Sequence, residues 1–298
     1  MGCGRWGRHV LRDLVDLGCD VIVVVRSRES RERAEAGGAT GVVASIEELP
    51  AVEGAVVVTP TTTHAEVLGR VLDRGIPVFV EKPLTDDPAD ATALARRAPR
   101  RLFVMHKWRH HPGVEALASI ARSGELGPVS SLRTTRIGWG NPHGDVDGVW
   151  MLAPHDISIV LEVLGTIPEP RAAAIERSGG MVTGLVGLLG EGEPNAAIEV
   201  SIASGERRRE LRLVCRDGVA ILSDPYSDHV LIARGELQGD VTREEERRPI
   251  SLELPLLREL RAFVSHLGGG PPPRSSAAEG AAEVAAIARL RDLTGAEG

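Results

Sequence analysis

The chain has 298 residues, of which 42% are hydrophobic and 26% are charged, and its formal net charge is −7. This length predicts two domains with substantial cores. The acidic balance argues against a nucleic-acid-binding protein, because a phosphate backbone requires a basic face. No apolar run approaches the roughly 20 residues of a membrane-spanning helix, and no basic-then-apolar signal opens the sequence. We therefore expect a cytoplasmic protein whose partners are small molecules.

A glycine-rich loop stands at the start of the chain. Residues 2–7 match the pattern G-x-G-x-x-G and run into an apolar stripe at helical spacing that ends at Gly18. Such glycines permit a tight turn and a close approach of the backbone to a pyrophosphate, whose charge lies at the helix N-terminus. The sequence therefore predicts a dinucleotide site that includes Gly2, Gly4, Arg5, Trp6 and Gly7.

The strand that normally precedes such a loop is missing from the sequence. In a doubly wound sheet this strand is central, and its omission would expose the edges and apolar faces of its neighbours. We hypothesise that the recorded start is internal and that Met1 stands where a strand-end residue belongs. An upstream reading frame without an apolar strand would contradict this hypothesis.

The end of the second strand bears on the choice of cofactor. Residues 20–25 read as a parallel strand, after which a carboxylate usually binds the ribose 2′-hydroxyl. Here the chain has Arg26, Ser27 and Arg28. A guanidinium beside a hydroxyl suits a 2′-phosphate, which favours NADP(H), with NAD(H) as the other candidate. The alternative is a basic start to the next helix, over residues 29–36.

Further strands of the first domain end in polar residues. Ala55–Val58 runs into Thr59 and Pro60, and a threonine-capped helix should follow with His64 in its first turn. Val78–Val80 ends in Glu81, Lys82 and Pro83, which places Lys82 at the carboxyl edge of a parallel sheet, where ligands bind. The Lys82–Pro83 peptide is a candidate for the cis form. Other predicted elements of this domain are strands at 41–44 and 102–105, helices at 8–17 and 88–97, and a brief helix opened by a capping box at 45–48.

A polar segment crosses into the second domain at residues 106–112. Its three histidines lack a carboxylate or cysteine that would complete a metal set, so we predict no metal and favour a polar cleft lining that includes Trp108 and Arg109. A solvated linker is the alternative. A helix is expected at 114–122 and a strand at 129–137. The loop 138–148 is long and polar enough to contact a ligand.

The rest of the second domain combines helices with period-two strands. Pro154 suits the first turn of a helix, which would place His155 and Asp156 near the helix start. The alternative there is a helix cap with a structural histidine. A tight hairpin at 216–218 and consecutive strands indicate a largely antiparallel sheet, with one face covered and the other free for substrate or a second subunit. The predicted strands are 172–176, 182–189, 196–202, 210–215, 219–222 and 250–254, and the predicted final helices are 256–267 and 277–293.

Taken together, these motifs resemble the Gfo/Idh/MocA family, named after glucose-fructose oxidoreductase, inositol dehydrogenase and a rhizopine-catabolism protein. The resemblance spans nearly the whole chain and rests on the glycine loop, Thr59-Pro60 with His64, Glu81-Lys82-Pro83 and His155-Asp156. It implies an α/β fold with an N-terminal Rossmann doubly wound parallel sheet over 1–106, lacking its first strand. An α+β domain with a large, mostly antiparallel open sheet would follow over 107–298. The last helix is a candidate to pack back on the first domain, and the open sheet is a candidate surface for a homodimer or homotetramer.

The resemblance also implies a function. It implies an NADP(H)-dependent oxidoreductase that transfers a hydride between nicotinamide and a hydroxyl-bearing or keto carbon of a sugar, sugar phosphate or nucleotide sugar. His155 would be the general acid/base and Lys82 would hydrogen-bond the same oxygen. Thr59, Pro60, His64, Glu81 and Lys82 would join the cofactor site. The implied substrate-binding residues are Lys82, Trp108, Arg109, Asn141, His143, Trp150, His155 and Asp156.

One position departs from the family pattern. Members commonly carry an aspartate four residues before the histidine, where this chain has Met151. This departure motivates a second hypothesis, a catalytically silent cofactor- or sugar-binding relative that acts as a partner or sensor. A third is an imine or tetrapyrrole reductase, because one fold supports several substrates.

Overall fold

The computed structural model describes residues 1–142, 144–235 and 243–295, and it divides the chain into two compact units. The first unit comprises Met1–Lys107 and Leu254–Val284, and the second comprises Trp108–Glu253 and Ala285–Gly298. The chain thus returns to the first unit after residue 253, whereas the sequence analysis divided the chain once, at residue 106. Within the described ranges, no helix combines the length and apolar character needed to cross a bilayer.

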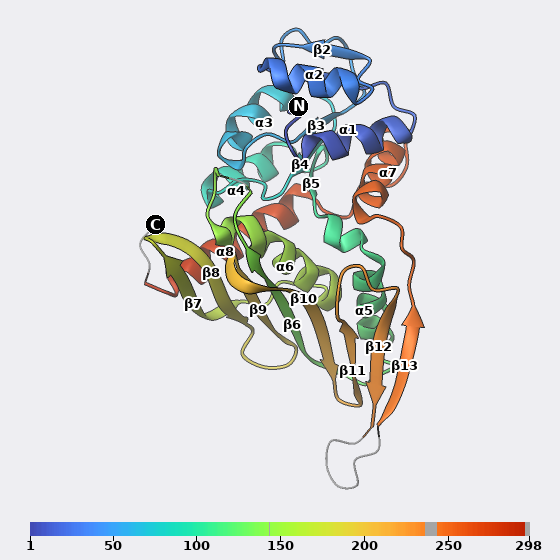
Figure 1. Ribbon diagram of the computed structural model, residues 1–298, viewed down its shortest axis with the longest axis vertical. Helices are drawn as coiled ribbons and strands as arrows, with labels where there is room; N and C mark the ends of the chain where they lie inside the picture. Colours follow the sequence, from blue (N-terminus) through green and yellow to red (C-terminus); the bar gives the residue numbers. More distant parts are fainter. Residues whose placement is uncertain (143, 236–242, 296–298) are drawn as a thin grey trace. The chain divides into compact units, whose positions relative to one another are not determined.

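The first unit is built from parallel strands connected by helices (Figure 1). A two-stranded sheet has the order β1-β2, and a three-stranded sheet has the order β3-β4-β5. The strands are β1 (Ile22–Val24), β2 (Gly41–Val43), β3 (Ala55–Val57), β4 (Val78–Glu81) and β5 (Leu102–Met105). Helix α1 (Gly7–Asp16) precedes β1, and α2 (Arg28–Ala36), α3 (His64–Leu72) and α4 (Pro88–Arg97) follow β1, β3 and β4. The expected alternation of strand and helix is confirmed, except that no helix separates β2 from β3.

A later part of the chain completes the core of this unit. Helix α7 (Pro255–Leu267) places Phe263 against Phe79 of β4, with the ring centroids 5.0 Å apart. The start of α8 (Ala277–Asp292) lies on the sheet, since a Cβ on Gly280 would be 2.6 Å from Val104. Apolar side chains from α1, α7 and the strands therefore share one buried cluster.

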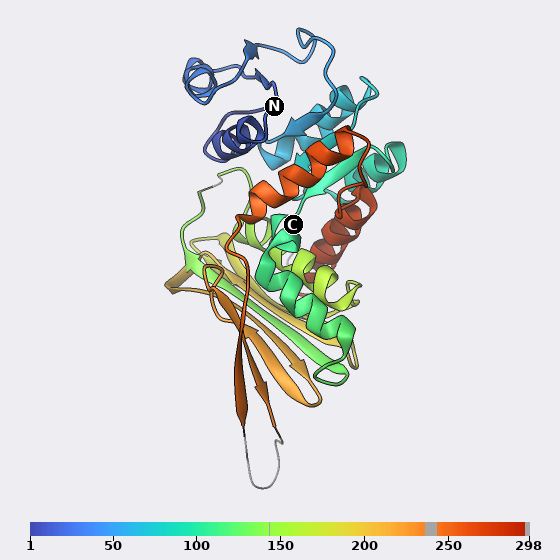
Figure 2. The same ribbon diagram turned by 90° about the vertical axis from the view of Figure 1, so that its right-hand side faces the viewer.

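The second unit contains an eight-stranded sheet of order β13-β12-β11-β10-β6-β9-β8-β7. Each neighbouring pair is antiparallel except β6 and β9. Figure 2 shows helices α5 (Pro112–Ser123) and α6 (Gly148–Leu164) against one face of this sheet. The strands are β6 (Val129–Trp139), β7 (Pro170–Ser178), β8 (Met181–Leu189), β9 (Asn195–Ser201), β10 (Ala203–Cys215), β11 (Gly218–Leu222), β12 (His229–Arg234) and β13 (Glu244–Pro249).

The start of α6 differs from the sequence prediction. The helix begins at Gly148, where the Asp147 carboxylate accepts from the amides of Val149 and Trp150. Pro154 therefore lies inside the helix and not in its first turn, and His155 follows it. Asp147 also forms an ion pair with Arg291 at 2.6 Å, and this distant partner holds the earlier start in place.

Three other local predictions were wrong. Residues 45–48 form turns and no helix, although the Ser45 hydroxyl does bond the Glu48 carboxylate, because Pro50 follows too soon for a helix to extend. Thr63 precedes α3 without a side-chain cap bond, since its hydroxyl donates to the Pro60 carbonyl. The last strand is the charged β13 and not 250–254, and β12 was not predicted. An edge strand with exposed positions lacks the apolar alternation that would reveal it.

Candidate active site

The glycine loop of residues 2–7 has three glycines with different surroundings. Gly2 has a φ of +86°, and a Cβ there would lie 2.5 Å from the Val58 carbonyl oxygen. A Cβ on Gly7 would lie 2.5 Å from the Gly2 carbonyl oxygen. A Cβ on Gly4 would meet no atom of the described residues within 4 Å. Packing explains Gly2 and Gly7, whereas Gly4 leaves open space beside the backbone, as close approach of a pyrophosphate requires.

The N-terminus of α1 adds a positive end to this loop. Its N-cap residue, Trp6, makes no side-chain hydrogen bond that caps the helix, and the first turn of α1 contains no acidic residue. Arg5 is exposed in the same loop. First-turn amides and the helix dipole attract anions, so the loop has the chemistry of a phosphate site.

A cavity of about 440 Å³ lies beside the loop. Its walls hold residues from the loop, from the end of β1 and from the end of β3, so the carboxyl ends of parallel strands meet there. The volume is within the range of small-molecule sites. Six of the residues that the sequence predicted to bind the cofactor line this cavity. They are Gly2, Gly4, Arg26, Ser27, Thr59 and Pro60.

The two arginines after β1 have different environments. Arg26 is exposed and lines the cavity. Arg28 lies on the surface of α2, where its Nε donates to Glu32 at 2.7 Å and its side chain is 91% exposed. Between them, Ser27 lines the cavity and also caps α2 by accepting from the Ser30 amide. Of the two guanidinium groups, the one on Arg26 faces the candidate cofactor space.

His64 is completely buried at the start of α3. Its Nδ1 lies 3.0 Å from the Pro83 carbonyl oxygen and its Nε2 lies 3.0 Å from the Thr59 carbonyl oxygen. The imidazole thus joins the loop after β3 to the loop after β4. The sequence placed His64 among the cofactor contacts. In the structure its ring is buried and is absent from the lining of the 440 Å³ cavity.

Charged residues gather at the ends of β4 and β5. The Trp6 indole donates to the Glu81 carboxylate at 3.0 Å, and the Lys107 ammonium lies 4.1 Å from the centroid of that indole. Burial raises the pKa of Glu81, while Lys82 and Lys107 lower it. Lys82 directly follows β4, is buried, and precedes Pro83 through a cis peptide. This cluster therefore connects the glycine loop to the predicted catalytic lysine.

His155 in the second unit lies beside an aromatic and ionic cluster. The Trp108 ring meets the His155 ring at an angle of 70° with centroids 6.3 Å apart, and it stacks on His111 at 5.2 Å. The Arg136 guanidinium lies 4.4 Å from the Trp108 ring centroid and donates to Asp156 at 2.6 Å. Both members of this ion pair are buried. Trp108 thus links His155 to a buried charge pair.

Other predicted substrate residues make contacts within the second unit. Arg109 pairs with Glu162 at 2.9 Å and is buried, and Asp156 is held by Arg136. The Asn141 amide donates to the Val146 carbonyl within the loop before α6. Trp150 packs against the apolar core. These contacts give the four residues supporting positions, and His143 lies outside the described residues.

Two residues of these clusters were absent from the sequence prediction. Lys107 lies two residues after the end of β5, near the same carboxyl edge at which Lys82 follows β4, so its strand-end position was an available signal. Arg136 shares a strand face with Leu132 and Thr134, and period-two alternation would have placed it on the buried face. Its partner Asp156 is 20 residues away, which no local pattern shows.

The sequence comparisons point to one family. Residues 1–106 match the Gfo/Idh/MocA model, described as an oxidoreductase family with an NAD-binding Rossmann fold. Inositol 2-dehydrogenase of Streptomyces avermitilis is 27% identical over 258 residues, which cover 80% of this chain and 75% of that protein. UDP-N-acetylglucosamine 3-dehydrogenase of Acidithiobacillus ferrooxidans is 30% identical over 180 residues, 58% of this chain and 56% of that protein.

Solved structures show the same fold. The UDP-N-acetylglucosamine 3-dehydrogenase of A. ferrooxidans superposes with a TM-score of 0.84 at 22% identity, over 98% of this chain and 95% of the other. A levoglucosan dehydrogenase in complex with NADH and levoglucosan has a TM-score of 0.85 at 14% identity, over 99% and 95%. The family match, the dehydrogenase relatives and the shared fold agree. Residues 1–106 thus match the NAD-binding Rossmann domain of the Gfo/Idh/MocA oxidoreductase family, and the proteins to which the chain is similar include sugar and polyol dehydrogenases.

Proposed function

We propose that this chain is an NADP(H)-preferring oxidoreductase that acts on a hydroxyl-bearing or keto carbon of a cyclic sugar or polyol. The cavity beside the glycine loop carries this proposal, because a glycine with open space, an uncapped helix start and an arginine occur together there. Relatives named for inositol, UDP-N-acetylglucosamine and levoglucosan support the substrate class. A bound nicotinamide would supply the hydride chemistry.

The preference for NADP(H) is argued from the end of β1. No carboxylate occurs in the segment 26–28, and Arg26 lines the cavity beside the Ser27 hydroxyl. A guanidinium recognises a phosphate by charge-assisted hydrogen bonds, whereas a ribose 2′-hydroxyl calls for a carboxylate. Arg28 is a matched control, since it has the same side chain but pairs with Glu32 on the surface of α2.

The cofactor proposal predicts a difference between two variants. Arg26→Ala should weaken NADPH binding about 10-fold or more and leave NADH binding nearly unchanged, because one charged hydrogen-bond donor to a phosphate is lost. Arg28→Ala should change neither. Fluorescence titration with each dinucleotide measures this. Equal losses for both cofactors, or an Arg28→Ala effect as large as that of Arg26→Ala, would contradict the preference.

The proposed catalytic roles fall to Lys82 and His155. An ammonium donates hydrogen bonds to a substrate oxygen and stabilises negative charge that develops on it. An imidazole titrates near working pH and can accept or return the hydroxyl proton. The contacts of each residue within its own unit support these roles: Lys82 follows β4 beside the Glu81 cluster, and His155 lies beside Trp108.

The catalytic proposal predicts loss of turnover without loss of cofactor. Lys82→Met and His155→Ala should each lower kcat about 100-fold or more, since each removes a group that acts in the transition state. NADPH affinity should change little. His229→Ala is the control, because His229 begins β12 and is paired with the exposed Asp228 that precedes it. Steady-state assays with cyclic polyols and nucleotide sugars check this, and unchanged turnover in either variant would remove that residue from catalysis.

A second candidate function rests on Met151. This side chain is buried in α6 one turn before His155, and a thioether cannot hold a proton there. That observation favours a relative that binds cofactor and sugar without turnover. Reproducible oxidation of any sugar by the purified chain would exclude it, whereas saturable NADPH binding with no turnover across the substrate panel would support it.

A further inference from the structure

The second unit holds a partly buried arginine whose side chain has no partner. Across the part of the chain that the structure describes, the Arg209 guanidinium forms no side-chain hydrogen bond and no ion pair. Two other arginines of β10 differ from it, since Arg208 pairs with Glu210 at 3.2 Å and Arg212 pairs with Glu210 at 2.9 Å. A guanidinium carries five donors and a permanent charge, so one that is partly removed from water calls for an acceptor.

Arg209 lies on the helix-covered face of the eight-stranded sheet. Leu211, Leu213 and Cys215 of β10 belong to the core that packs against α5 and α6, and side-chain alternation places Arg209 on the same face. Arg136 of β6 stands directly opposite Arg209 in the strand pairing. The two arginines therefore extend from the same face of the sheet as cross-strand neighbours.

The pairing of β10 with β6 is interrupted next to this position. Regular pairing begins at Arg208, whereas residues 204–207 stand against one residue of β6, Gly138. Bulges of this kind bend a strand and redirect its side chains, and they are common next to active sites. Residues 205–207 are exposed, so this end of the strand is open to solvent.

The charges around Arg209 do not balance. Arg136 donates to the Asp156 carboxylate at 2.6 Å, which leaves one carboxylate for two guanidinium groups. Burial lowers the pKa of Arg209, and the positive charges of Arg136 and Arg207 lower it further, while Asp156 raises it. Like charges on directly opposite residues of neighbouring strands are destabilising. An anion bound at Arg209 would therefore remove an unfavourable interaction as well as form a favourable one.

This unbalanced charge belongs to the cluster that contains His155. Asp156 follows His155 in α6, and Arg136 lies 4.4 Å from the centroid of the Trp108 ring. The same Trp108 ring meets the His155 ring with centroids 6.3 Å apart. Arg209 is therefore connected through Arg136 to the proposed general acid/base, and all of these residues belong to the second unit.

We propose that Arg209 binds an anionic group of the substrate, a phosphoryl or carboxylate group, while the reacting carbon of the sugar lies at His155. The inference rests on the proposed function for the sugar itself and narrows the substrate class to sugar phosphates, nucleotide sugars and sugar acids. The planar guanidinium fork matches two oxygens of either anion and forms charge-assisted hydrogen bonds to them.

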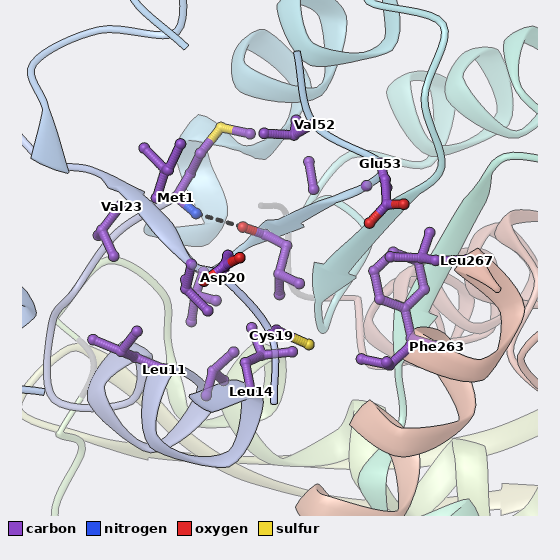
Figure 3. Close-up of a pocket in the computed structure, with 18 of the residues that line it drawn as sticks. Met1, Leu11, Leu14, Cys19, Asp20, Val23, Val52, Glu53, Phe263 and Leu267 are labelled. Atoms are coloured by element: carbon purple, nitrogen blue, oxygen red, sulfur yellow. Dashed lines mark hydrogen bonds between the residues drawn. The ribbon is translucent and has the colours of Figure 1, made fainter. Parts of the chain in front are cut away.

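The cavity of about 700 Å³ in the first unit does not offer a comparable anion site. Its walls are mainly apolar, and the two acidic residues that line it are Asp20 and Glu53, both labelled in Figure 3. None of the residues lining this cavity is an arginine, a lysine or a histidine. Two carboxylates without a basic side chain repel an anion, whereas the surroundings of Arg209 attract one.

The first test measures whether an anionic group raises the affinity for a sugar. Isothermal titration calorimetry of the full chain, with and without NADPH, compares three pairs of probes. The pairs are glucose with glucose 1-phosphate, N-acetylglucosamine with UDP-N-acetylglucosamine, and glucose with glucuronate. In at least one pair the anionic probe should bind about 10-fold or more tightly than the neutral one. The third pair distinguishes a carboxylate from a phosphoryl group.

The second test assigns the preference to Arg209. Arg209→Met should lower the affinity for the anionic probe about 10-fold or more and leave the neutral probe unchanged, because a charged donor is lost. Arg209→Lys keeps the charge without the planar fork and should recover part of the affinity. Arg208→Met is the matched control, since the adjacent Arg208 is exposed and pairs with Glu210. This control should change neither affinity.

A melting temperature separates ligand binding from a structural role. Arg209→Met should melt no lower than the wild type, because the substitution removes a like-charged neighbour of Arg136. A lower melting temperature together with equal losses for both probes of a pair would show a structural role and overturn the proposal.

The remaining outcomes also decide the proposal. The absence of an anion preference in every pair would overturn it, even where turnover of a neutral polyol upholds the proposed function. An Arg208→Met loss as large as that of Arg209→Met would overturn it as well. Arg209-dependent binding of an anionic sugar without turnover would support the anion site and count against the proposed function alone.

Discussion

At the scale of single residues, His64 connects two loops of the first unit through its ring nitrogens. The carbonyl groups of Thr59 and Pro83 are its partners, and the ring is fully buried. Those loops carry Pro60 of the candidate cofactor cavity and the catalytic candidate Lys82. A change at His64 should therefore affect both stability and cofactor affinity, although its side chain is absent from the cavity lining.

His64→Ala should lower the free energy of unfolding by about 2 to 4 kcal/mol, because a fully buried ring and its hydrogen bond to a loop carbonyl group are both lost. NADPH affinity should fall as the two loops lose their connection. His64→Gln keeps an N–H donor and part of the side-chain volume, so it should fall between the wild type and His64→Ala in both measurements. Urea denaturation and dinucleotide titration check this, and a stable His64→Ala variant with unchanged affinity would remove the supporting role.

At the scale of elements, α7 brings a second carboxyl group to the β4 end. Glu259 is buried in this helix, and burial raises its pKa well above 4.5, with the neighbouring Glu81 raising it further. In the unfolded chain Glu259 would ionise near pH 4.5. The folded state thus holds a proton that the unfolded state releases. The stability that this protonated carboxyl group contributes is fully present below pH 4.5 and is lost as the pH rises through the pKa of Glu259 in the folded state.

Glu259→Gln should remove this loss, because the amide cannot ionise. Its melting temperature should exceed that of the wild type at pH 8 by about 2 °C or more, and the difference should shrink toward pH 5. Glu66→Gln is the control, since that carboxylate is 73% exposed. Calorimetry across this pH range measures the effect, and parallel curves for wild type and Glu259→Gln would contradict a protonated Glu259.

At the scale of the whole molecule, the eight-stranded sheet has one face without helices in the described chain. Exposed apolar side chains lie on this sheet, among them Trp139, Val186 and Leu188. Contiguous exposed apolar residues mark association surfaces, and an isologous dimer would bury the same patch on both copies.

We expect Val186→Glu together with Leu188→Glu to shift the protein from an oligomer toward a monomer, because desolvating carboxylates at an apolar interface is costly. Sedimentation velocity over a concentration series measures this. Leu252→Glu, at another exposed apolar position, is the control. A wild-type chain that is monomeric at all concentrations, or a double variant with unchanged sedimentation, would exclude this face as the interface.

Sequence alone determined the features that depend on short stretches of chain. Alternating apolar strands and helices predicted the parallel architecture of the first unit, and the spacing of Gly2, Gly4 and Gly7 predicted the tight loop that runs into α1, because backbone conformation and strand burial act locally.

The tertiary structure decided what depends on distant partners. Asp147 starts α6 earlier than Pro154 suggested and pairs with Arg291, which is 144 residues away. Arg136 meets Asp156 from another element, and residues 254–284 return to the first unit. Ion pairs and packing of this kind join positions whose separation along the chain carries no periodic signal. Whether a polar residue supports the fold or faces a ligand is therefore set by three-dimensional contacts.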